Sequence, residues 1–188
     1  PTVTVAQVQV GLLAEARDLQ DSLNSLAERT NTNTSSGRLQ ILQETTLSLL
    51  RHPEYWVYAS ASSEQTKLQQ AEAKFNQFSL QERSKFTEET LYNVSGRRQN
   101  SETSTSSELT KVQAPGEYIM VTVVVGVQDK LKLPEINNSK DLEQTLRQLG
   151  SVSSDSLLAV ETLWTPQAKG DTLTADDLLA EYPQLHLL

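Results

Sequence analysis

Residues 117–127, EYIMVTVVVGV, are the most strongly patterned stretch of the chain and decide its fold class. Valines and other apolar residues follow one another with almost no polar interruption, which is typical of a strand buried on both faces. The stretch therefore predicts a central β-strand, around which the remaining strands and helices pack.

Three further strands are predicted from shorter patterns. Residues 3–12 alternate between valine-rich apolar positions and glutamines, which is the period-two pattern of a strand. Residues 54–62, EYWVYASAS, carry apolar side chains on both sides and predict an interior strand. The apolar run 157–164, LLAVETLW, predicts a strand that ends before Pro166, since proline cannot donate the next backbone hydrogen bond.

Helices are predicted between these strands. Two of them flank the polar loop 30–37, whose Ser-Ser-Gly end can cap the second, and a third covers about 64–93. Within this third segment, Ser79 and Glu82 have the spacing of a capping box, which predicts a break and a new helix starting at Leu80.

The second half of the chain predicts two shorter helices and a long loop. Residues 139–150 have the pattern of a helix with Ser139 as its N-cap and Gly150 as its C-cap, and residues 174–183 form a capped turn stopped by proline. Residues 95–116 are polar and of low complexity, so they predict a mobile loop that is dispensable for folding over 97–114.

This order of elements indicates one α+β domain over residues 1–188. We expect a mixed sheet of about four strands covered by helices, with one long polar loop, because helices bury the apolar face of a sheet in this class. The start at Pro1, without a methionine, predicts a soluble fragment or a processed form.

Charge and composition exclude several classes of function. The net charge is −8, and Arg97 and Arg98 form the only close basic pair, so nucleic acid is not an expected partner. Anionic membrane surfaces are disfavoured by the same argument. The chain has no cysteine, which excludes disulfides and thiol catalysis.

No residue set in the sequence predicts catalysis, a metal site or a cofactor site. The features considered are two histidines, two acidic pairs and two matches to the glycosylation pattern: His52 and His186, Glu88 with Glu89 and Asp176 with Asp177, Asn93-Val94-Ser95 and Asn137-Asn138-Ser139. The histidines share no local motif, and adjacent acidic residues point to different sides of a helix. We therefore expect no catalytic, cofactor-binding or metal-binding residues and a protein that is not an enzyme.

Trp164 has two interpretations. At the end of a predicted strand it can be the plug that closes the core, or the lip of a binding site. Burial of an indole beside the terminal helix is the commoner arrangement, since its N–H needs only one acceptor. We therefore predict the plug.

Several segments together resemble a known family. They are VAQVQVGLLAEARDLQ, LQETTLSLLRHPEYWVYASAS, KFNQFSLQERSKFTEETLYNV, YIMVTVVVGVQ, LPEI, LRQLGSVSSDSLLAVETLWTPQ and DTLTADDLLAEYPQL, in this order. The combination is similar to a conserved-domain family of unknown biochemical activity in cyanobacteria and chloroplasts, whose plant members include the fluctuating-light acclimation protein. RHPEYW, ERSKF.EETL and LWTPQ are its most specific parts.

The resemblance implies a role without naming a site. It implies a thylakoid-associated protein that helps to acclimate photosynthesis, through energy dissipation and the proton gradient, with a membrane tether N-terminal to this chain. A cyanobacterial origin is expected. The implied position is the cytoplasmic or stromal side, and the implied partners are proteins at the thylakoid membrane. No catalytic residue or cofactor is carried over.

Two functions from different classes stay open. The first is a non-enzymatic regulatory or scaffolding domain that acts by protein contact. The second is a small-ligand-binding or enzymatic α+β domain with a pocket between sheet and helices. A pocket with converging polar groups would favour the second function, and a shallow surface would favour the first.

Overall fold

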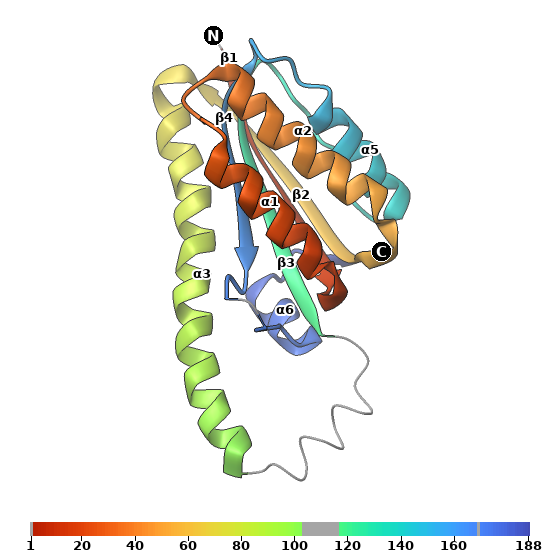
Figure 1. Cartoon of the computed structure of the whole chain (residues 1–188). Coiled ribbons are helices and arrows are strands. Elements are labelled where there is room, and N and C mark those ends of the chain that lie inside the picture. Colours follow the sequence, from red (N-terminus) through yellow and green to blue (C-terminus); the bar gives the residue numbers. More distant parts are fainter. Residues whose placement is uncertain (1, 103–116, 169) are drawn as a thin grey trace.

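A computed structural model of the chain describes residues 2–102, 117–168 and 170–188, with side chains omitted from 86 to 102. It has an α+β fold, as predicted (Figure 1). The strands are β1 (Thr2–Leu13), β2 (Trp56–Lys67), β3 (Tyr118–Gln128), β4 (Leu157–Thr165) and β5 (His186–Leu187). The helices are α1 (Arg17–Arg29), α2 (Ser35–Arg51), α3 (Leu68–Glu102), α5 (Ser139–Gly150) and α6 (Ala175–Glu181), with short 3-10 turns at Ala14–Ala16 and Pro53–Tyr55.

The strands form one sheet in the order β4-β3-β1-β2-β5. Every pairing between these strands is antiparallel, so the expectation of a mixed sheet is wrong. Strands β1 and β3 are central, which confirms the prediction from residues 117–127, and the short β5 was not predicted. The connections from β1 to β2 and from β3 to β4 reverse the strand direction, whereas β2 and β3, like β4 and β5, run the same way and are not neighbours in the sheet.

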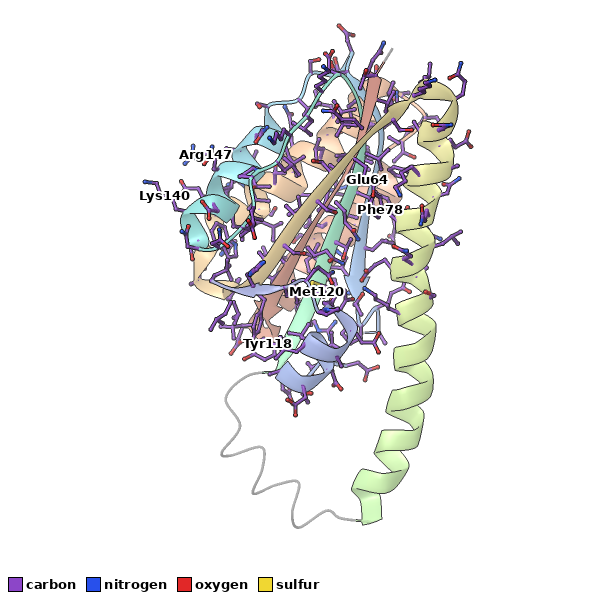
Figure 2. The ribbon with its side chains drawn as sticks, turned by 180° about the vertical axis from the view of Figure 1, so that it is seen from behind. Glu64, Phe78, Tyr118, Met120, Lys140 and Arg147 are labelled. Atoms are coloured by element: carbon purple, nitrogen blue, oxygen red, sulfur yellow. The ribbon has the colours of Figure 1, made fainter. Side chains whose placement is uncertain are left out.

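The two faces of the sheet are covered differently. Helices α1, α2 and α5 lie over one face (Figure 1) and enclose the main core, which includes alternate residues of β3 from Ile119 to Val127. On the opposite face, α3 runs along one side and α6 lies at one end, as the view from behind shows (Figure 2). There Phe75 and Phe78 of α3 pack against Val3, Val5 and Val124.

Helix α3 is continuous, so the predicted break at Leu80 is wrong. The side chains of the supposed capping box are used elsewhere. Ser79 donates to the Glu161 carboxylate of β4 at 2.7 Å, and Glu82 turns into the protein interior. The helix also starts later than expected, because residues 64–67 extend strand β2.

Strand β2 lies between β1 and β5, as predicted for an interior strand, but its second half is an edge. Strand β5 pairs only with Tyr58 and Ala59 in the described ladder, which leaves residues 61–67 with β1 on one side. This end of the strand, ASSEQTK, is polar or small and mostly half-buried or exposed. Its charged and polar side chains suit an edge exposed to water.

Helix caps differ from two of the predictions. Asn138, not Ser139, is the N-cap of α5, since its side chain accepts from the Asp141 backbone N–H at 2.9 Å. Gly150 is the last residue of α5 rather than its cap. A Cβ at this position would lie 3.0 Å from Thr46 Oγ1, so glycine here allows α5 to pack closely against α2.

The predicted loop 95–116 is only partly within the described chain. Its first part, to Glu102, belongs to α3 and is helical, and 103–116 lies outside the described residues, as does most of the predicted mobile segment 97–114. Among the helices that the structure describes, none has the length and apolar composition required to cross a bilayer.

Candidate functional site

A buried carboxylate lies at the centre of a polar cluster between α3 and the sheet. Glu82 is 1% exposed, although ionised side chains are rarely buried without partners. The Thr165 hydroxyl donates to Glu82 Oε1 at 3.2 Å, and the Tyr182 hydroxyl donates to the same oxygen. Gln9 Nε2 donates to the other oxygen at 3.1 Å. Both carboxylate oxygens are therefore satisfied by protein groups.

Lys85 supplies the nearest positive charge. Its Nζ lies 3.7 Å from Glu82 Oε2, one helical turn further along α3, and 4.0 Å from the centroid of the Tyr182 ring. A buried carboxylate needs both a counter-charge and hydrogen bonds to offset its desolvation. Lys85 provides the counter-charge while it contacts the face of an aromatic ring.

Gln9 extends the cluster across the sheet. Its amide also donates to Thr122 Oγ1 at 3.3 Å, and its carbonyl accepts from the Ser60 hydroxyl at 3.3 Å and from the Gln184 amide. The cluster thereby joins β1, β2, β3 and β4 to α3 and to the segment before β5. Hydrogen-bond networks of this kind fix the relative positions of the elements that they connect.

A polar groove of about 430 Å³ opens above this cluster. Its lining includes three buried polar residues, Gln9, Ser60 and Glu82, and three exposed ones, Gln81, Gln184 and His186. The remaining lining residues are Gln7, Ala61, Ser62, Lys85, Glu135 and Ile136. Its amide and hydroxyl groups suit polar recognition by hydrogen bonds. Within the described ranges, no group of three or more histidine, aspartate or glutamate side chains is arranged to hold a metal ion.

The two histidines lie in different surroundings. His52 Nδ1 is 2.8 Å from Glu54 Oε1, and its ring stacks on Tyr55 with centroids 5.4 Å apart. The hydrogen bond from His52 lowers the pKa of the exposed Glu54 carboxyl. His186 lies exposed in β5 at the groove. His52 therefore forms a surface pair with Glu54.

The acidic pairs, the matches to the glycosylation pattern and the arginine pair either lie at the start of a helix or have side chains outside the described ones. Asp177 forms the capping box of α6 with Thr174, in which each side chain accepts from the other's backbone N–H. Asp176 lies beside it in the first turn, and Asn138 is the cap of α5. For five further positions on α3, the side chains lie outside the described ones: Glu88, Glu89, Asn93, Arg97 and Arg98.

Trp164 is 4% exposed and belongs to the main core, so its predicted burial is confirmed, although the terminal helix α6 packs in a different cluster. It nevertheless also borders a cavity of about 310 Å³ between β4, α1 and α2. Its indole N–H is shielded from solvent and has no hydrogen-bond partner among the described residues. Leaving such a donor unsatisfied costs about 1–3 kcal/mol.

Arg17 on α1 is the other side chain with a shielded, unpartnered nitrogen in the described chain, at Nη2. Its Nη1 donates to Gln20 Oε1 at 2.7 Å, and Gln20 in turn donates to the Gln167 carbonyl at 3.3 Å. Burial lowers the pKa of Arg17, while Asp171 and Asp21 act in the opposite direction. This chain of contacts fastens α1 to the segment after β4.

Sequence reasoning missed the Glu82 cluster because its members are far apart in the chain. Glu82 matched a local capping pattern, and nothing in the pattern connects it with Thr165 or Tyr182. One signal was available: Gln9 places an amide within a strand of otherwise mostly apolar, buried residues. A polar side chain at such a position needs a partner.

The chain is similar to known proteins along its whole length. A family model described as "Protein of unknown function (DUF1517)" matches residues 2–188. Protein FLAP1 homolog A of Synechocystis sp. (strain ATCC 27184 / PCC 6803 / Kazusa) is 50% identical over 192 residues, covering 100% of this chain and 58% of that protein. FLUCTUATING-LIGHT-ACCLIMATION protein 1, chloroplastic, of Arabidopsis thaliana is 42% identical over 187 residues, covering 98% of this chain and 46% of that protein. The chain thus spans about half the length of these curated relatives. No solved structure matches it.

Proposed function

Because the chain belongs to the DUF1517 family of proteins of unknown function, we propose that it is a regulatory domain that helps to acclimate photosynthesis to fluctuating light. The observation that carries this proposal is the 42% identity over 98% of the chain to a relative named for fluctuating-light acclimation. Identity at this level along the whole domain supports the same fold and the same kind of role.

The proposal includes action by protein contact rather than by catalysis. In the Glu82 cluster, both carboxylate oxygens already accept hydrogen bonds from protein side chains. A general base needs a lone pair that can reach its substrate, so this arrangement favours a stabilising role for Glu82. The C-terminal part of α3 extends beyond the end of the sheet (Figure 1). This projecting length of helix supports a surface for a protein partner.

We place this partner at the thylakoid membrane, on the cytoplasmic or stromal side. The relatives are about twice as long as the chain, and the proposed membrane tether belongs to the part of them that the chain does not span. The domain would then present its partner-binding surface beside the membrane.

A domain exchange tests the proposal. In Synechocystis, the matching region of Protein FLAP1 homolog A is replaced by this chain, and chlorophyll fluorescence is recorded while light alternates between low and high intensity. We expect the exchanged strain to follow wild type, and a strain without the gene to differ from both. If the exchanged protein accumulates to the normal level but the strain behaves like the deletion, the proposed role is wrong.

The claim of protein contact needs its own control. The exchanged, membrane-anchored protein is cross-linked in intact cells and captured. A second version, in which the projecting end of α3 from residue 95 to residue 102 is deleted, is treated in the same way. We expect a partner to be captured with the full helix and lost with the shortened one, while thermal unfolding shows both domains folded. Equal capture by both versions would contradict a contact through α3.

A further inference from the structure

The cavity beside Trp164 is formed by three elements. Val160, Thr162 and Trp164 lie on one face of the edge strand β4 and form its floor. The walls come from α1 and α2, and the connection between these helices closes one side: the lining residues are Leu23, Asn24, Ala27, Thr32, Ile41 and Thr45, together with Glu161. Asn24, Ala27 and Thr32 are exposed and mark the entrance.

Trp164 distinguishes this cavity, because this residue of the floor has a buried indole donor without a partner in the described chain. The other tryptophan of the chain, Trp56, donates its N–H to the Leu49 carbonyl at 3.0 Å, as half-buried indoles usually do. Trp164 is more deeply buried, yet among the described residues its N–H finds no acceptor. Buried polar groups nearly always have a partner, so an acceptor beyond the described residues is the expected complement.

The lining also defines the charge of a ligand. Thr45 and Thr162 place two hydroxyl groups 3.5 Å apart in the cavity wall. Glu161 is the one acidic side chain of the lining, and its carboxyl group is held by Ser79 and Arg83 from α3. The lining therefore has no unpaired charge that could bind a ligand. A charged ligand would lose its hydration in the cavity and gain no counter-charge in return.

We propose that this cavity binds a small, neutral and largely apolar molecule whose carbonyl or ether oxygen accepts the Trp164 N–H. The volume of about 310 Å³ is twice the cavity of about 150 Å³ that holds benzene, so a ring with a short substituent fits. The N–H is shielded in the free fold, so the ligand displaces the side chains that cover it. This inference does not depend on the role in light acclimation.

The test uses the complete 188-residue chain and three matched probes. Acetophenone carries a neutral ring and a carbonyl oxygen, α-methylstyrene replaces that oxygen by a CH₂ group, and benzoate adds a negative charge. Binding is followed by the NMR signal of the Trp164 indole N–H, which Trp56→Phe assigns because the chain has two tryptophans. We expect acetophenone to bind about 2- to 12-fold more tightly than α-methylstyrene, the factor that one net hydrogen bond gives. Benzoate should not bind.

Three variants locate the effect. Trp164→Phe keeps an apolar ring but removes the donor, so acetophenone and α-methylstyrene should then bind equally. Ala27→Leu should fill the entrance and abolish binding, whereas Ser25→Leu, an exposed control on the same helix outside the lining, should leave it unchanged. The comparison of Ala27→Leu with Ser25→Leu decides the question even if Trp164→Phe does not fold.

Three results would overturn the inference. The Trp164 signal could stay unchanged up to the solubility limit of acetophenone, which would leave the cavity without a ligand of this class. The ketone and the alkene could bind wild type equally, which would mean that the N–H is not used. Binding could survive Ala27→Leu, which would place the ligand elsewhere.

Discussion

Replacement of Glu82 by alanine should destabilise the fold strongly, although glutamates on helices usually lie at the surface, where such a change costs little. The carboxylate accepts from three donors that belong to different elements, namely Thr165, Tyr182 and Gln9. Its removal takes one acceptor from each of these buried groups, of which Gln9 still donates to Thr122. The control is Glu72→Ala, which changes an exposed glutamate on the same helix.

The expected loss of unfolding free energy follows from the number of buried donors that lose the Glu82 carboxylate as an acceptor. Each buried donor without a partner costs about 1–3 kcal/mol. Part of this cost is offset, because the variant no longer buries a carboxylate, a step that costs several kcal/mol by itself. We expect a net loss of about 3–5 kcal/mol, as for other buried charge networks that lose one partner. Glu72→Ala should change stability by about 0.5 kcal/mol or less.

Urea denaturation monitored by circular dichroism measures both variants. The comparison is valid if the slope of unfolding free energy against urea is unchanged, because the slope reports the surface exposed on unfolding. Glu82→Gln retains one acceptor oxygen and should fall between wild type and Glu82→Ala. A loss below about 1 kcal/mol for Glu82→Ala, the level of ordinary surface changes, would refute the reasoning that the cluster holds α3 on the sheet.

Three further changes test other parts of the structure. Trp164→Ala should cost about 3–5 kcal/mol, the range for large aromatic residues removed from a core, and a loss below about 1 kcal/mol in urea would contradict its burial. Asn138→Ala should lower stability by about 0.5–2 kcal/mol because it removes the α5 cap, and thermal unfolding should show almost no change for Ser139→Ala. Burial raises the pKa of Tyr118, so the folded state holds this proton more tightly than the unfolded chain, and stability should fall as the pH rises above about 10. Denaturation between pH 9 and pH 11 should show a shallower fall for Tyr118→Phe, and parallel curves for the two proteins would count against the shift.

The sequence predicted those elements whose own residues carry a strong pattern. The valine run of β3 needed no other part of the chain for its identification, and the alternation in β1 was equally local. Trp164 was correctly expected in the core because an indole at a strand end usually packs inward. The cavity beside it could not be predicted, since it depends on how α1 and α2 meet over β4.

The errors arose where one residue type serves two structures. Ser79 and Glu82 have the spacing of a cap, but their side chains bind partners on β4 and near the C-terminus instead. Residues 64–67 are polar and were assigned to a helix, yet their backbone completes the ladder with β1. In both cases tertiary contacts overrode a weak local preference, which single-sequence patterns do not contain.

The central place of β1 has a consequence for how the chain folds. Val3 pairs with Thr66 on one side and with Gln128 on the other, so the middle of the sheet joins residues from the beginning and the last third of the chain. Non-local pairing of this kind slows folding. At synthesis rates of about 5–20 residues per second, β3 leaves the ribosome on the order of seconds after β1 and β2. During that interval a valine-rich strand edge is exposed, and it is then that the nascent protein most needs protection from aggregation.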